Sequence, residues 1–142
     1  MRRDNEAQEN SITVLTNLFE HREVKAHFIN PCCFGEDFAA WLRQRLLVAP
    51  DLGVALSEPI QEDYGWGFYA SRTKDRVWIA ISYVGDGPQE EPAEWIISST
   101  AASAFNLIGR FFRKQNPQVL GRLRDRIRQI LASNSAITIV AP

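Results

Sequence analysis

The chain has 142 residues and a mass of 16.1 kDa, which suits one domain of ordinary size. Its residues are 45% hydrophobic and 23% charged, as in an average soluble globular protein, and this excludes a disordered chain, a collagen-like fibre and a disulfide-stapled miniprotein. The 16 basic and 17 acidic residues nearly cancel, so the net charge indicates no general affinity for nucleic acid or membranes.

The N-terminal sequence and the cysteines predict the compartment. Two arginines near the start are followed by acids and amides rather than by an apolar run, unlike a signal peptide. The longest uncharged stretch, 95–109, has 15 residues and is too short and too polar to span a bilayer. Cys32 and Cys33 are adjacent, which allows no conventional disulfide framework. We therefore expect a cytoplasmic protein with free thiols and no membrane contact.

The N-terminal part of the chain predicts a tail and two strands. Residues 1–10 contain no repeating apolar position and are expected to form a flexible tail, which leaves 11–142 as a single α+β domain. Residues 11–19 are β-branched and apolar enough for a strand, with a short helix as the alternative. Residues 23–29 alternate between apolar and polar side chains, which predicts a half-buried strand that ends at a turn before a proline.

The next element is a helix predicted over residues 35–48. Glu36 and Asp37 fall in its first turn, where the positive end of the helix dipole favours acids. The apolar residues of this segment are spaced to form one stripe, which consists of Phe38, Trp41, Leu42 and Leu46.

A meander of strands is predicted after this helix. The loop-like stretch 49–65 leaves room for a short strand at 54–56. Residues 66–72 and 76–84 predict two strands joined by a connection of hairpin length, and 94–100 predicts a third strand. The aromatic residues expected to supply much of the sheet's buried bulk are Trp66, Phe68, Trp78 and Trp95.

The C-terminal part predicts a second helix and a last strand. Residues 101–116 follow no single period, so their structure stays open. The helix is expected over 117–133, with Asn116 as its N-cap and an apolar stripe along one side. Residues 136–140 predict a final short strand.

This order of elements favours an α+β fold. The economical packing is a two-layer sandwich, in which a mainly antiparallel sheet of about five strands carries two helices on one face.

The first group of candidate chemical residues precedes the first predicted helix. Cys32 and Cys33 stand before a helix N-terminus, a setting that lowers the pKa of a thiol. A nucleophilic cysteine at this place would use His27 or His21 as its base and Asp37 as the orienting group. The neighbouring acids oppose a thiolate, so packing of small apolar side chains is the favoured interpretation. Adjacent cysteines also lack the spacing that lets two sulfurs face one zinc ion, and we expect no metal site.

The second group lies within residues 57–70. Glu62 and Asp63 precede Tyr64 and Trp66 at the start of a predicted strand. Paired carboxylates beside a tryptophan could perform acid–base chemistry if burial separated their pKa values. They could equally form an acidic, aromatic-lined edge that binds a basic partner. The alternative is a solvated loop that leads into a core strand.

The third feature is the placement of charge. Residues 51–100 hold nine acids and three bases, whereas 101–142 hold seven bases and one acid. The arginines of the last predicted helix form two pairs spaced by four residues, Arg122 with Arg126 and Arg124 with Arg128. Such a face could contact phosphates. The favoured interpretation is a solvated helix face that meets the chain's own acidic loop.

Two segments resemble an uncharacterised family of small bacterial α+β proteins. The segment C-[FY]-G-E-D-F-x-x-W-L corresponds to residues 33–42, and S-E-P-x-x-E-D-x-G-W-x-F corresponds to 57–68. Shorter similar segments follow at 78–82 and 92–95. The resemblance implies a compact bacterial α+β domain. It transfers no functional residue, because the family has no established activity.

We therefore expect a non-enzymatic binding module for a protein or small ligand of basic character, with no cofactor and no catalytic residue. The alternatives are a small enzyme that uses Cys33 or the carboxylates of Glu62 and Asp63, and a domain that binds phosphate or nucleic acid through its C-terminal arginine helix. The expected binding surface joins two loops and consists of Cys33, Asp37, Glu62, Asp63, Tyr64 and Trp66.

Overall fold

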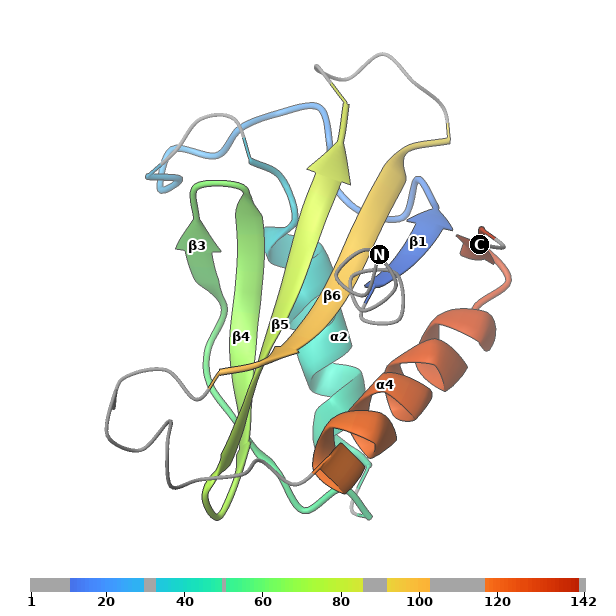
Figure 1. Ribbon diagram of the computed structural model, residues 1–142. Coiled ribbons are helices and arrows are strands. Elements are labelled where there is room, and N and C mark those ends of the chain that lie inside the picture. The colour runs from blue at the N-terminus through green and yellow to red at the C-terminus, as the bar shows by residue number, and fades with distance from the viewer. Residues whose placement is uncertain (1–10, 30–32, 50, 86–91, 103–116, 141–142) are drawn as a thin grey trace, which may run out of the picture.

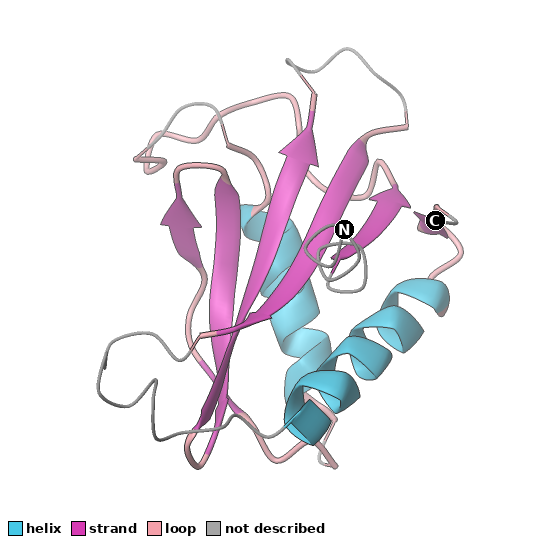
Figure 2. Cartoon of the chain, in the orientation of Figure 1, coloured by secondary structure: helices cyan, strands magenta, loops and turns pink. Residues whose placement is uncertain are grey.

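A computed structural model of the chain describes residues 11–29, 33–49, 51–85, 92–102 and 117–140. They contain one sheet of seven strands and two helices (Figures 1 and 2). The strands are β1 (Ser11–Leu15), β2 (Ala55–Leu56), β3 (Ile60–Glu62), β4 (Gly65–Arg72), β5 (Asp75–Val84), β6 (Glu94–Ala101) and β7 (Thr138–Ile139), and the helices are α2 (Glu36–Leu47) and α4 (Pro117–Ala132). Neither of these helices is long and apolar enough to cross a membrane.

The sheet is antiparallel and confirms the α+β class. Its order is β2-β4-β5-β6-β1-β7, and β3 also pairs with β4. The prediction of about five strands is wrong. The missed strand β3 has only three residues, too few to show an alternating pattern. The predicted tail at 1–10 and the open segment at 103–116 lie outside the described residues.

The half-buried strand predicted over 23–29 is also wrong. This segment is a loop that contains a turn, in which the N–H of Phe28 donates to the carbonyl of Lys25. The side chain of Val24, expected to be buried, is 41% exposed. The alternation is present in the sequence, but a strand also needs a partner strand, and residues 23–29 pair with none of the strands that the structure describes.

Helix α2 forms where the sequence predicts it. It begins after Gly35, whose φ of 127° belongs to the region that favours glycine. Phe38, Leu42 and Leu46 are buried at intervals of four residues, so one face of the helix packs against β4 and β5. In Figure 1 this helix lies behind the sheet.

Helix α4 packs beside α2 and against β6 and β7. Its buried residues recur at every fourth position, which is the spacing of one helix face: Val119, Leu123, Ile127 and Leu131. The expected N-cap, Asn116, lies outside the described residues.

One cluster of buried side chains joins both helices to the sheet. Trp66, Phe68 and Trp95 belong to it, as predicted, and Trp95 is completely buried. The prediction for Trp78 is wrong. Its neighbours on β5, Val77 and Ile79, both enter the core, and adjacent side chains of a strand point to opposite faces.

Candidate functional site

The face of the sheet opposite the core carries a pair of aromatic rings. On β4, Phe68 and Ala70 are completely buried in the core, so Tyr69 between them points to the other face. Trp78 on β5 lies opposite Tyr69 in the strand register and therefore shares this face. The ring centroids are 4.6 Å apart and the planes are tilted by 52°.

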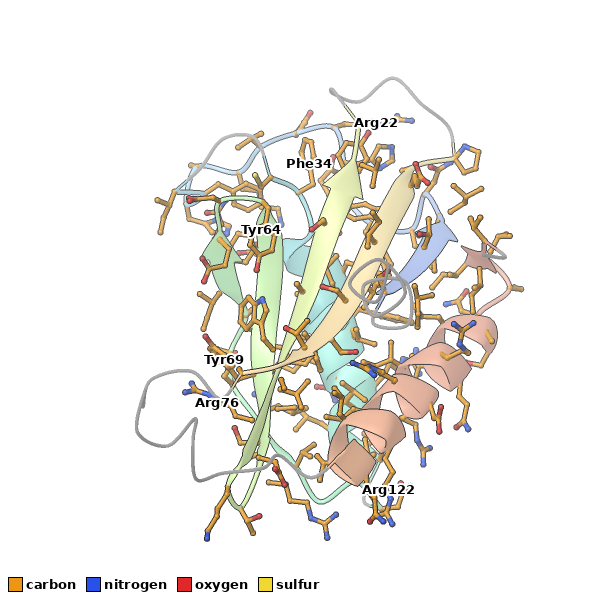
Figure 3. All side chains as sticks on the ribbon, in the orientation of Figure 1. Arg22, Phe34, Tyr64, Tyr69, Arg76 and Arg122 are labelled. Atoms are coloured by element: carbon orange, nitrogen blue, oxygen red, sulfur yellow. The ribbon has the colours of Figure 1, made fainter. Side chains whose placement is uncertain are left out.

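Tyr64 and Arg76 extend this pair at its two ends. The indole N–H of Trp78 donates a hydrogen bond to the phenolic oxygen of Tyr64 over 2.7 Å. The guanidinium carbon of Arg76 lies 3.9 Å from the ring centroid of Tyr69, a cation–π contact. Figure 3 shows Tyr64 at one end of β4, with Tyr69 and Arg76 toward the other end. We call Tyr64, Trp78, Tyr69 and Arg76 the aromatic row.

Side chains of β3 and its turn border the aromatic row. Ile60 and Glu62 pair with Gly67 and Gly65, which alternate with the core residues of β4, so both side chains lie on the face of the row. Asp63, in the turn that follows, is exposed. The aromatic row together with Glu62 and Asp63 is called the acidic–aromatic surface below.

The two loops that the sequence singles out do meet in the structure. The indole N–H of Trp66 donates to the carbonyl of Cys33 over 2.9 Å, and the sulfur of Cys33 lies 3.2 Å from the carbonyl oxygen of Asp63. A second link joins the N–H of Ile29 to the side-chain oxygen of Gln61 over 2.6 Å. Cys33 and Trp66 are only 7% and 5% exposed, so they fasten one loop to the other from the buried side.

Cys33 contradicts the expectation of free thiols, because its sulfur is disulfide-bonded. Cys32, the only other cysteine of the chain, lies outside the described residues. A nucleophilic cysteine needs a thiolate, which a disulfide sulfur does not provide. Cys33 therefore supplies no nucleophile in this structure.

Asp37 makes its hydrogen bonds with backbone groups rather than with the other predicted binding residues. One oxygen of its carboxylate accepts the backbone N–H of Glu20 over 2.7 Å, and the other accepts that of Phe38 over 2.9 Å. The carboxylate of Glu20 in turn accepts the N–H groups of Glu23 and Arg22, and these bonds hold the pKa of Glu20 below its ordinary value. Asp37 thus anchors a turn near the start of α2.

His27, the candidate base for Cys33, pairs with Glu36 instead. Its Nε2 lies 2.5 Å from a carboxylate oxygen of Glu36, and Lys25 approaches the other oxygen to 4.0 Å. The His27 ring stands edge-on to that of Trp66 at 6.4 Å. Within the described ranges, no three side chains of His, Cys, Asp or Glu gather as a metal site requires.

The four arginines of α4 serve different sides of the helix. Arg126 forms a 2.5 Å ion pair with Asp51, and Arg124 donates to the hydroxyl and carbonyl oxygens of Ser99. Arg122 and Arg128 are exposed, and Figure 3 shows Arg122 at the lower end of α4. The ion pair of Arg126 joins the helix to Asp51, an acid in a loop of the same chain, which is the kind of contact that the favoured interpretation of this helix predicts.

Sequence reasoning missed Trp78, Tyr69 and Arg76. A signal was available in the hairpin between β4 and β5. Arg72 pairs with Asp75, so the connecting loop has two residues. Counting outward from a two-residue loop sets Tyr69 opposite Trp78 and Arg76 opposite Ser71.

The comparisons with known proteins found no relative of this chain. No family model matches the chain, and neither the curated proteins nor the solved structures contain a match. The resemblance of residues 33–42 and 57–68 to a family of small bacterial proteins therefore stays a prediction.

Proposed function

We propose that this protein is a non-enzymatic binding module, and that its acidic–aromatic surface contacts a protein or small ligand of basic character. The observation that carries the proposal is the hydrogen bond from Trp78 to Tyr64, which holds an exposed phenol in a defined position. Tyr64 is 50% exposed, so its ring is presented to solvent rather than used in the core.

A surface of this kind suits a cationic partner for two reasons. Aromatic side chains supply large contact areas, and a ring that is already held in place loses little conformational entropy on binding. The carboxylates of Glu62 and Asp63 attract positive charge and raise the rate of encounter. Arg76 on Tyr69 shows that a ring of this row accepts a guanidinium at its face.

The proposal takes the domain as a two-layer arrangement, in which α2 and α4 cover one face of the sheet and the other face serves a partner. It keeps the single domain over 11–142 and the cytoplasmic location that the sequence predicts. The disulfide at Cys33 counts against that location, because disulfides are rare in a reducing cytoplasm. An enzyme that uses the carboxylates of Glu62 and Asp63 is less well supported. Glu62 borders an open sheet face and Asp63 is exposed, so neither lies in a closed pocket that would exclude water.

The test is a quantitative pull-down from a bacterial lysate with the wild type and the double variant Glu62→Gln/Tyr64→Ala. Neither side chain is buried, so circular dichroism should show that the variant keeps its fold. A partner that the wild type holds should be lost by the variant, and its capture should weaken as salt is raised.

The matched control is Glu23→Gln/Val48→Ala, which also removes one exposed carboxylate and one exposed apolar side chain, neither of which belongs to the acidic–aromatic surface. A partner retained by the control and lost by the test variant supports the proposal. Identical lists of captured proteins from wild type and test variant would show that this surface binds nothing in the lysate, and the proposal would fall.

A further inference from the structure

A cavity of about 180 Å³ lies on the other side of the sheet, between α4 and the strands β6 and β1. Ile12, Ile97 and Ile127 form its apolar wall. Because this side of the sheet faces the helices, the cavity is separate from the acidic–aromatic surface and independent of the proposed function.

Gly121 opens this cavity. It lies inside α4, where a glycine destabilises a helix relative to alanine. A Cβ placed on Gly121 would meet no atom within 4 Å, so close packing in the described structure does not require a glycine there. Because Gly121 lines the cavity and has no side chain, it leaves space there that a ligand can fill.

The mouth of the cavity carries more positive than negative charge. Arg124 lines it and is held against the sheet by Ser99, whose oxygens accept its Nε–H over 3.3 Å and its Nη2–H over 3.1 Å. Arg128 stands one turn further along the helix and is exposed, with no hydrogen bond or ion pair to any residue that the structure describes. Asp125 is the single acid among the lining residues that the structure describes, and the net charge of those residues is +1.

We propose that this cavity binds a small carboxylate with an apolar body, of about the size of benzoate. An apolar cavity of about 150 Å³ holds benzene, so the space beside Gly121 is sufficient for one ring or a short branched chain. The carboxylate would face Arg128 and Arg124, since a guanidinium matches the two oxygens of a carboxylate in shape and charge. The ring would contact the three isoleucines.

The proposal is tested with benzoate as the probe and two-dimensional amide NMR as the readout. Benzoate should shift the amide signals of Ile97, Ser99 and Gly121, with a dissociation constant of about 1 mM, which is realistic for a ligand with so few atoms. Benzamide has the same shape without the charge and should bind about tenfold more weakly, because it loses a charge-assisted hydrogen bond.

Two variants remove different parts of the site. Arg128→Gln should weaken benzoate binding about tenfold, whereas the matched control Arg122→Gln, on the same helix but outside the cavity, should not. Gly121→Leu should abolish binding by filling the cavity, with thermal unfolding used to confirm that the variant is folded.

Each of the following results overturns the proposal. One is the absence of shifts at about 10 mM benzoate, ten times the expected dissociation constant. Another is equal binding of benzoate and benzamide, which would remove the role of charge. The third is wild-type affinity in Arg128→Gln, or shifts that gather away from α4 and β6.

Discussion

Trp78 lies directly over Gly67. A Cβ placed on Gly67 would come within 2.4 Å of Cζ2 of the Trp78 indole and within 2.5 Å of the carbonyl oxygen of Ile79. The absence of a side chain at Gly67 therefore leaves the space that the indole occupies while it donates to Tyr64. The glycine that the sequence shows between two aromatic residues is a requirement of the aromatic row.

The first prediction concerns this contact. Gly67→Ala should lower the free energy of unfolding by about 1–3 kcal/mol, because the new methyl group meets both an indole ring and a backbone oxygen that cannot easily move. Urea denaturation followed by circular dichroism measures the change. A variant as stable as the wild type would show that Trp78 does not rest on Gly67.

The second prediction is that Gly121→Ala should stabilise the protein, whereas Gly67→Ala destabilises it. Its Cβ meets nothing within 4 Å, and alanine is the better helix former, so the free energy of unfolding should rise by up to about 1 kcal/mol. The same urea titration compares the two glycine variants. A loss of stability in Gly121→Ala would mean that space beside the helix is smaller than the structure shows.

The third prediction is a pH dependence at Glu20. The N–H groups of Glu23 and Arg22 stabilise its carboxylate, so its pKa in the folded protein lies below the ordinary value of 4.5. The wild type should therefore be more stable than Glu20→Gln at neutral pH. That advantage should be present above 4.5 and disappear as the pH falls through the lowered pKa.

The size of this effect should stay below about 1 kcal/mol, since the carboxylate is exposed and its bonds are screened by water. Glutamine retains an oxygen acceptor, so the comparison isolates the charge. Thermal unfolding of both proteins between pH 3 and pH 7, roughly the range over which carboxyl groups titrate, measures it. An advantage that grows on acidification would contradict the lowered pKa.

The fourth prediction concerns Cys33. Without a reducing agent, iodoacetamide should not label Cys33 of the native protein, because its sulfur is disulfide-bonded and its side chain is buried. Unfolding alone should not expose a thiol, whereas unfolding with dithiothreitol should. Mass spectrometry of peptides locates the label. Rapid labelling of Cys33 in the native, unreduced protein would restore the nucleophile hypothesis.

Local patterns were sufficient for much of this fold. The acids after Gly35 and the stripe from Phe38 to Leu46 predict α2 nearly residue by residue. They can do so because helix ends and helix faces depend on residues that are close together in the sequence. The same holds for β4, β5 and β6, which are long enough to show strand character. The alternation of 23–29 led to a wrong prediction, because a local alternation carries no information about a partner strand.

The candidate site depended on tertiary contacts to a greater degree. The residues of the two loops, including Glu62, Asp63 and Tyr64 of the acidic–aromatic surface, could be chosen from the sequence alone. That Cys33 and Trp66 join these loops from inside, across 33 residues of chain, and that Trp78 turns outward to hold Tyr64, became visible in the folded chain. Side-chain direction follows from strand register, and register is set by pairing between segments rather than by any one segment.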